Sequence, residues 1–257
     1  MSVEPQHHTN RDDNEPATTV QPVEKKKEHI AQMFDDIAPK YDFLNRFLSV
    51  RIDKIWRRKA VNKLRGLQLE EVLDVASGTA DLALTLYKKL RPKHITGIDI
   101  SEGMLEIGRR KIQKKGLERQ ISLLSGDSEN IPFETSSFDA VTVSFGVRNF
   151  EHLDEGLREI YRVLKPGGKL VILEFSVPRT GLFRKLYLFY FLRILPFVGR
   201  LVSKNNSAYG YLPDSVLSFP SGAEFGKILE HCGFSDVCVH SLSFGIACIY
   251  TGVKIER

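Results

Sequence analysis

Between residues 71 and 168, short runs of apolar and β-branched residues alternate with longer stretches in which the apolar positions follow a helical period. The short runs predict strands, and the longer stretches predict amphipathic helices. The predicted strands are Val72–Ala76, His94–Ile98, Ile121–Leu124, Ala140–Phe145 and Lys169–Phe175. The predicted helices lie near 81–91, 102–115 and 154–164. Because such alternation is typical of βαβ units, we expect an α/β domain with a mostly parallel sheet.

Both flanks of this region are helical or apolar in pattern. Residues 25–65 predict helices that precede the sheet and lie over it as a lid. Residues 182–202 are strongly apolar but interrupted by three arginines, a lysine and a proline. A membrane-spanning helix needs about 20 predominantly apolar residues, so a mobile flap, an interfacial helix or a hydrophobic substrate cap fits this segment better. The chain closes with a predicted helix near 222–231 and two predicted strands, Val237–His240 and Ile246–Val253.

Composition sets the expected domain organisation. With 257 residues, of which 42% are hydrophobic, the chain can bury one full core. Residues 1–24 lack apolar periodicity and predict a disordered tail. We therefore expect one domain over 25–257, made of the lid at 25–65, a cofactor-binding core at 66–175, an apolar insertion at 176–220 and a C-terminal helix with a strand pair at 221–257.

Charge and cysteine usage bear on compartment and partners. The start of the chain has no basic stretch leading into an apolar one, so we expect no secretory signal and a cytoplasmic location. The spacing of Cys232, Cys238 and Cys248 fits neither a zinc site nor a disulfide framework, which favours free thiols and no metal. The net charge of +5 suits an anionic membrane surface or an anionic ligand and does not call for nucleic acid. Peripheral contact with the inner face of a membrane and a homodimer are both compatible with the sequence.

A candidate ligand-binding loop follows the first predicted strand, at Asp74 to Asp81. A small-residue turn between a strand and a helix places backbone N–H groups at the carboxyl end of the strand, where open α/β sheets bind ligands. Of the pattern acidic-x-Gly-x-Gly-x-Gly only Gly78 is kept, because Ala76 and Ala80 replace the other two glycines. Taken alone, the loop also fits an ordinary tight turn.

Polar residues also end the next three predicted strands. Asp99 lies 25 residues after Asp74, where a carboxylate accepts hydrogen bonds from both hydroxyls of a ribose. Asp127 and Ser128 follow the third strand and suit an adenine ring, and Ser144 ends the fourth. Together these residues predict one binding rim along the sheet. A dinucleotide-dependent dehydrogenase shares the acidic ribose ligand, but the loop lacks the third glycine of that class, which favours methyl transfer from S-adenosylmethionine.

Longer motifs resemble those of a known family. Tyr41-Asp42-Phe43-Leu44-Asn45, with Ser49 and Trp56 beyond it, resembles the first signature of the menaquinone/ubiquinone biosynthesis C-methyltransferases, the UbiE/MenG family. Further segments that resemble the family are Ser144–Asn149, Arg162–Gly168, Leu173–Ser176, Ala208–Ser215 and Phe219–Pro220. The resemblance covers about residues 28–253. It departs from the family at Asp53, where His is usual, and at Leu44, where Met is frequent.

The resemblance implies a class I S-adenosylmethionine-dependent methyltransferase with a Rossmann-like, seven-stranded sheet. It implies methylation of a ring carbon on a prenylated quinol, with demethylmenaquinol as the leading substrate. A benzoquinol of the ubiquinone pathway, or another small molecule or lipid, is the alternative acceptor, and a catalytically silent scaffold is the alternative outside enzymes. Carried over by position, the cofactor contacts fall on Thr79, Asp99, Asp127, Ser128 and Ser144, to which the loop adds Asp74 and Gly78.

The implied chemistry also indicates catalytic candidates. Ionising a quinol hydroxyl makes the adjacent ring carbon nucleophilic, so the protein must align the reactants, stabilise the phenolate and exclude water. Arg148 is our candidate for the partner of the phenolate, because it follows the fourth strand on the loop nearest the expected methyl group. Asn149 would orient the ring or a water, and Tyr41 would close over the cofactor. The alternatives are an ion pair for Arg148 and helix packing for Tyr41.

Overall fold

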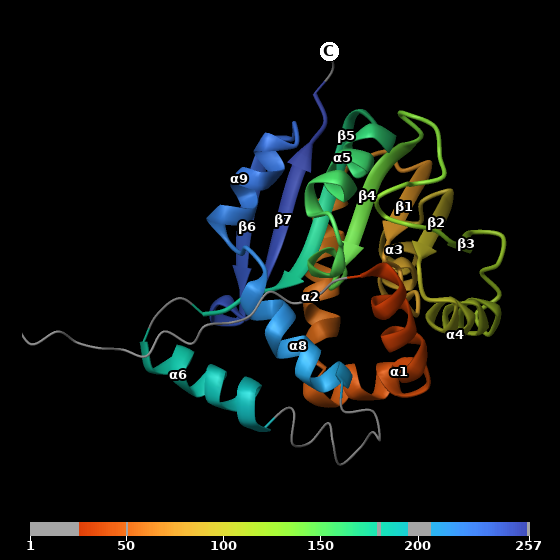
Figure 1. Ribbon diagram of the computed structural model, residues 1–257. Helices are drawn as coiled ribbons and strands as arrows, with labels where there is room; N and C mark the ends of the chain where they lie inside the picture. Colours follow the sequence, from red (N-terminus) through yellow and green to blue (C-terminus); the bar gives the residue numbers. More distant parts are fainter. Residues whose placement is uncertain (1–25, 50, 179–180, 195–206, 256–257) are drawn as a thin grey trace, which may run out of the picture.

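The protein is described by a computed structural model that covers residues 26–49, 51–178, 181–194 and 207–255 (Figure 1). Its centre is one seven-stranded sheet with the strand order β3-β2-β1-β4-β5-β7-β6. The strands are β1 Glu71–Val75, β2 His94–Asp99, β3 Ile121–Ser125, β4 Phe138–Ser144, β5 Leu164–Phe175, β6 Ser235–Leu242 and β7 Ala247–Val253. Neighbouring strands run parallel from β3 to β5, whereas β7 runs antiparallel to β5 and β6. The predicted seven-stranded, mostly parallel sheet is therefore confirmed.

Helices cover both faces of the sheet. The α-helices are α1 Lys27–Leu48, α2 Ile52–Val61, α3 Asp81–Leu90, α4 Glu102–Gln113, α5 Leu153–Val163, α6 Gly181–Phe189, α8 Ser207–Ser218 and α9 Ala223–His231. The first face of the sheet packs on α2, α3 and α4, and the second packs on α5 and α9. Along β1, Val72 joins the first layer whereas Leu73 and Val75 join the second. Because both faces are covered, the strands are apolar along most of their length.

The predicted element boundaries agree with the structure to within two residues, with one exception. This exception is β5, which begins at Leu164 rather than at Lys169, because Leu164 pairs with Phe138 ahead of a bulge in the ladder. The predicted start of α4 is confirmed, since the Ser101 hydroxyl accepts a hydrogen bond from the Met104 N–H at 3.2 Å.

The predicted lid and the predicted insertion each contain two helices with different surroundings. In the lid region, α1 lies beyond the carboxyl ends of the parallel strands (Figure 1), whereas α2 enters the core through Trp56, which is 4% exposed. The insertion forms α6, a π-helical turn at Tyr190–Ile194, and α8, which contacts α1. Among the described residues, no helix has both the length and the apolarity needed to cross a membrane. The predicted disordered tail, residues 1–24, lies outside the described residues, and so does the end of the predicted apolar segment, residues 195–202.

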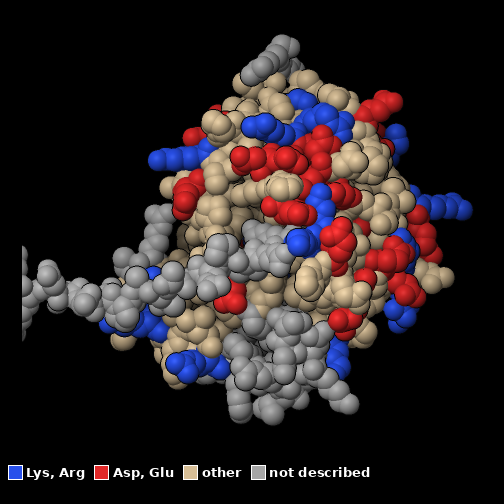
Figure 2. Space-filling model, in the orientation of Figure 1, with Lys and Arg blue, Asp and Glu red and all other residues tan. Residues whose placement is uncertain are grey.

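Charged groups of both signs are interspersed on the face of the molecule that Figure 2 shows. Figure 2 shows acidic and basic side chains side by side over the α/β core. All three cysteines are free thiols, with Cys232 and Cys248 buried and Cys238 exposed. The mixed surface agrees with the mild net charge of +5.

Candidate active site

A cavity lies at the carboxyl ends of the first four strands and encloses about 660 Å³ of space, part of which is open to solvent. Each of these strands contributes to the wall at or just after its end, through Gly78, Asp99, Asp127 and Ser144 respectively. The chain leaves the middle of the sheet in opposite directions after β1 and β4, and such a switch point is where open α/β sheets bind ligands. The rim predicted from the sequence is therefore a real cavity wall.

The loop after β1 keeps the backbone of a glycine-rich loop although two glycines are replaced. Ala76, Gly78 and Ala80 have φ values of +51°, +52° and +63°, in the left-handed region that favours glycine. Close packing explains another glycine, because a Cβ atom on Gly146 would lie 2.4 Å from the Cβ of Ala76. The loops after β1 and β4 thus approach each other closely, and both line the cavity.

Asp99 is held rigidly at the end of β2. Its Oδ2 accepts the backbone N–H of Gly78 at 2.8 Å and its Oδ1 accepts that of Ser101 at 2.9 Å. Burial raises the pKa of Asp99 to about 6, although these two N–H bonds oppose the shift. Above that pH the side chain is a carboxylate that can accept hydrogen bonds from a diol in the cavity.

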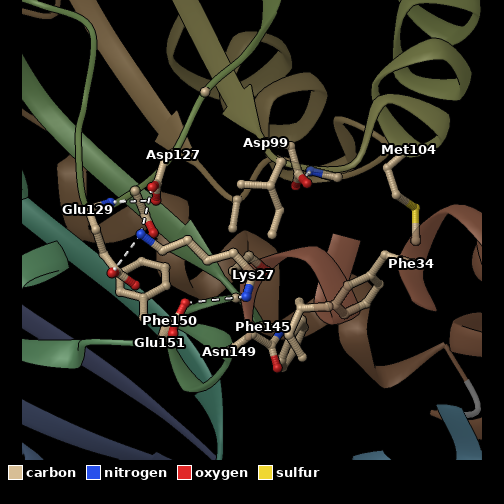
Figure 3. A pocket seen from close by; sticks show the side chains of 18 of the residues that line it. Lys27, Phe34, Asp99, Met104, Asp127, Glu129, Phe145, Asn149, Phe150 and Glu151 are labelled. Carbon is tan, nitrogen blue, oxygen red and sulfur yellow. Dashed lines mark hydrogen bonds and ion pairs between the residues drawn. The ribbon is translucent and has the colours of Figure 1, made fainter. Parts of the chain in front are cut away.

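Asp127 follows β3 and lines the cavity, and its carboxylate forms an ion pair with the lid helix α1. The Lys27 Nζ of α1 lies 2.7 Å from Asp127 Oδ2 and 2.9 Å from Glu129 Oε2, and the Lys27 backbone N–H donates to Glu151 at 3.3 Å (Figure 3). The ion pairs raise the pKa of Lys27, so this side chain stays charged. The sequence alone does not single out Lys27 or Glu129, because the basic run at residues 25–27 has the pattern of a solvated helix face and no motif includes Glu129.

Two further predicted residues, Ser128 and Ser144, also line the cavity. The Ser144 hydroxyl is buried and has no hydrogen-bond partner among the described residues. A buried hydroxyl without a partner costs free energy unless a ligand satisfies it. The carboxylate of Asp99, the hydroxyl of Ser144 and the apolar walls together fit a nucleoside ligand with polar substituents, such as S-adenosylmethionine.

Thr79 and Asp74 lie close to the cavity but not in its wall. The Thr79 hydroxyl donates to Asp42 of α1 at 2.6 Å and accepts from Lys111 at 2.8 Å, so it links the lid to the loop after β1. Asp74 is 1% exposed and accepts the Thr142 hydroxyl at 2.7 Å. Burial raises the pKa of Asp74 to about 7. Both residues support the loop from behind in this structure.

Arg148 is fixed in the core of the protein. Its guanidinium is 2.9 Å from Glu174 Oε1 and 3.4 Å from the Ser215 hydroxyl, and it also donates to the carbonyl of Phe145. Glu174 is fully buried, so it needs such a partner. Arg148 therefore does not line the cavity. The predicted contact with substrate would require its guanidinium to be exposed in the cavity wall.

Asn149 and Tyr41 do line the cavity. Asn149 ends the short helix Val147–Asn149 after β4, and its Oδ1 accepts the hydroxyl of Tyr211 at 3.1 Å. Tyr41 packs edge-on against Phe34 of the same helix, with ring centroids 6.1 Å apart. Of the three predicted catalytic residues, the structure thus brings two to the cavity.

The spacing Tyr-x-x-x-Lys, which is typical of some dehydrogenases, occurs in the chain at Tyr161 and Lys165. Lys165 pairs with Asp139 near the amino end of β4, at 2.5 Å, and Tyr161 packs against Phe234. Both are distant from the carboxyl ends of the strands that form the cavity. The spacing therefore has no part in the candidate site.

The strand order, the antiparallel β7 and the cavity with its acidic residue after β2 define a class I S-adenosylmethionine-dependent methyltransferase. Solved structures support the fold. An S-adenosylmethionine-dependent methyltransferase from Thermotoga maritima aligns with a TM-score of 0.60 at 21% identity, over 88% of this chain and 100% of that one. A phosphoethanolamine N-methyltransferase from Haemonchus contortus, in complex with S-adenosylmethionine, aligns with a TM-score of 0.59 at 15% identity, over 78% of this chain and 52% of that one.

The chain belongs to the ubiE/COQ5 methyltransferase family, whose model matches residues 22–254. A demethylmenaquinone methyltransferase from Bacteroides fragilis is 46% identical over 230 residues, which are 90% of this chain and 94% of that protein. A ubiquinone/menaquinone biosynthesis C-methyltransferase from Geobacter sulfurreducens is 49% identical over 237 residues, which are 92% of each chain. The family predicted from the sequence is therefore confirmed.

Proposed function

We propose that this enzyme uses S-adenosylmethionine to methylate a ring carbon of a prenylated quinol, with demethylmenaquinol as the first candidate. The observation that carries the proposal is 46% identity over 230 residues to a relative named for demethylmenaquinone, combined with a cavity whose wall carries both polar and aromatic side chains. Relatives named for both ubiquinone and menaquinone are 49% identical, which makes a benzoquinol the second candidate acceptor.

The polar side chains of the cavity wall suit the cofactor. Asp99 would accept the ribose hydroxyls, and Asp127 and Ser128 would hold the adenine. The Ser144 hydroxyl would form a hydrogen bond with the amino-acid part of the cofactor, and Gly78 would allow the loop to approach the cofactor closely. Thr79 and Asp74 would support this binding through the loop and the lid. When bound, S-adenosylmethionine supplies an electrophilic methyl group.

The aromatic side chains of the cavity wall suit an aromatic acceptor. Phe34, Phe145 and Phe150 line the wall, and Tyr41 closes it from the lid. Asn149 is the polar side chain that the short helix Val147–Asn149 contributes to this wall, so we assign it the contact with the phenolate oxygen. Arg148 would support this contact from the core, through the position of its neighbour Asn149.

Outside the cavity wall, α6 presents an apolar face that suits a lipid surface. Leu182, Leu186 and Phe189 are 82%, 63% and 59% exposed and lie on one side of the helix. The opposite side packs into the protein through Tyr187 and Phe191. The helix and the turn after it carry three basic and no acidic residues, and Figure 2 shows basic side chains there. We infer peripheral contact with an anionic bilayer, from which a prenylated quinol would be drawn.

The acceptor is tested by incubating the purified enzyme with labelled S-adenosylmethionine and either a demethylnaphthoquinol or a benzoquinol that lacks its ring methyl group, both of the same prenyl length. We expect label on the naphthoquinol ring in a bond that survives hydriodic acid, which cleaves aryl methyl ethers but not a C–C bond. Label in neither quinol, while S-adenosylmethionine binding is intact, would contradict the proposal. Preference for the benzoquinol would replace the first acceptor with the second.

A further inference from the structure

A hydrogen bond outside the proposed cofactor contacts joins α8 to the cavity wall. Tyr211 of α8 donates its hydroxyl to Asn149 Oδ1 at 3.1 Å. One turn further along α8, Ser215 lies 3.4 Å from the Nε of Arg148, the neighbour of Asn149. Residues four apart lie on the same face of a helix, so this face of α8 meets two consecutive residues of the Val147–Asn149 helix.

This contact decides how the carboxamide of Asn149 is oriented. An amide side chain has an acceptor oxygen and an NH₂ group that donates two hydrogen bonds. Because Oδ1 is taken by the Tyr211 hydroxyl, the NH₂ group is directed to the other side, and it makes no hydrogen bond with any described residue. The backbone of Asn149 is fixed as well, since its N–H donates to Gly146 O at 2.9 Å. The residue therefore presents donors at a defined position in the cavity wall.

We propose that Tyr211 is a positioning residue, which holds Asn149 so that its NH₂ group donates to the oxygen of the acceptor ring. This inference rests on the proposed quinol acceptor. Its chemical basis is that a preorganised donor aimed at developing negative charge lowers the barrier more than a donor that must reorient. A donor at this oxygen favours the ionised quinol, whose adjacent ring carbon is the nucleophile.

The surroundings keep Tyr211 a donor throughout the working pH range. Burial raises the pKa of its phenol to about 12, and Glu174 acts in the same direction. Arg148 opposes this shift but is itself paired with Glu174 at 2.9 Å. The hydroxyl therefore remains protonated near neutral pH and cannot serve as the base that removes the ring proton.

The test is a double-mutant cycle on the full-length enzyme, with Tyr211→Phe and Asn149→Asp. The first change removes only the hydroxyl, and the second keeps Oδ1 but removes the NH₂ donors. We expect Tyr211→Phe to lower kcat about tenfold with the KM for the quinol unchanged, which is the pattern of an interaction made in the transition state. We expect Asn149→Asp to lower kcat at least a hundredfold, and the double variant to lose no more than Asn149→Asp alone.

A control separates positioning from mere stability. Tyr187→Phe also removes a buried tyrosine hydroxyl from the insertion, but this hydroxyl has no hydrogen-bond partner among the described residues. It should leave kcat unchanged. Calorimetric binding of S-adenosylmethionine and the Tm should be the same for Tyr211→Phe and the wild type, which a structural role of the hydroxyl would not allow.

The outcomes distinguish this inference from the proposed function. If the wild type methylates a demethylnaphthoquinol and Tyr211→Phe does so with an unchanged kcat, the positioning role is wrong and the function stands. Additive losses in the double variant would also overturn it. If the wild type methylates neither quinol, the proposed function itself has failed.

Discussion

Two regions of the molecule, the cofactor end around α1 and the apolar end formed by α6 and α8, are held to the core by different kinds of contact. At the cofactor end, α1 is tied to the loops after β1, β2 and β3 by polar contacts, through Asp42 to Thr79, Asp35 to Ser101 and Lys27 to Asp127. At the apolar end, α6 and α8 are joined to the sheet mainly by apolar side chains that surround Tyr187, Phe191 and Val216. The polar contacts lie beside the cavity where the cofactor is proposed to bind, whereas this apolar cluster lies outside the cavity wall.

The difference also concerns solvent. The polar links are partly buried, whereas the apolar end has an exposed face on α6. An exposed apolar face of this kind marks a contact surface. We therefore expect changes at the cofactor end to alter binding of a soluble ligand, and changes on α6 to alter membrane partition without altering that binding.

The largest expected effect comes from Asp99→Ala. The change removes the acceptor for the ribose hydroxyls and leaves the N–H groups of Gly78 and Ser101 unsatisfied, so we expect at least a hundredfold weaker binding of S-adenosylmethionine. Isothermal titration calorimetry measures it. Asp139→Asn is the matched control, because Asp139 pairs with Lys165 near the amino end of the sheet. This variant should bind S-adenosylmethionine as tightly as the wild type does. Equal affinity for Asp99→Ala would remove Asp99 from the site.

The next effect tests the apolar end. We expect the triple variant Leu182→Ser, Leu186→Ser and Phe189→Ser to bind vesicles with 30% anionic lipid about 30-fold more weakly, because three partly inserted apolar side chains lose their burial. Sedimentation of the enzyme with vesicles measures it. Leu67→Ser, at an exposed leucine in another part of the fold, is the control. The comparison would fail if the triple variant bound vesicles as strongly as the wild type does. It would also fail if the triple variant bound S-adenosylmethionine more weakly.

A pH titration gives a tenfold effect at the cofactor end. Burial raises the pKa of Asp99 to about 6, and the ribose hydroxyls donate to its ionised form. Affinity for S-adenosylmethionine should therefore be constant above pH 7 and fall about tenfold by pH 5. Asp74→Asn should keep this profile, whereas Asp99→Asn should bind weakly at every pH. A flat profile for the wild type would contradict the ionised role of Asp99.

Stability of the free enzyme should show the opposite trend. A carboxyl group whose pKa in the folded state lies above its unfolded value stabilises the fold at low pH, and this contribution is lost as the pH rises through the folded pKa. Asp74 and Asp99, with pKa values of about 7 and about 6, place this loss between about pH 4 and 7. In urea unfolding, Asp74→Asn should lose less stability than the wild type over that range. An equal loss in both proteins would show that Asp74 does not titrate there.

The success and the failure of prediction from the sequence have a physical cause. Strands and rim residues such as Asp99 and Ser144 depend on local patterns, because parallel strands bring their carboxyl ends to one edge whatever their loops contain. The direction of a side chain is not local. Arg148 turns inward because the buried Glu174, 26 residues later, needs a cation. Tyr211 meets Asn149 across 62 residues, and Lys27 meets Asp127 across 100, so no spacing rule brings them together.

Lys27 gives the smallest expected effect and the sharpest test of how the polar end works. Its ammonium is one-third exposed and lies against Asp127 and Glu129, so it holds the start of α1 to the wall that is proposed to bind adenine. Lys27→Met should weaken S-adenosylmethionine binding about threefold, mainly through faster dissociation, because the lid loses one of its polar links. Stopped-flow measurement of dissociation shows it. Lys93→Met, which breaks a surface pair with Glu70, should change nothing. If Lys27→Met instead binds the cofactor more tightly, then Lys27 competes with adenine for the Asp127 carboxylate. In that case the Lys27 ion pair opposes cofactor binding instead of supporting it.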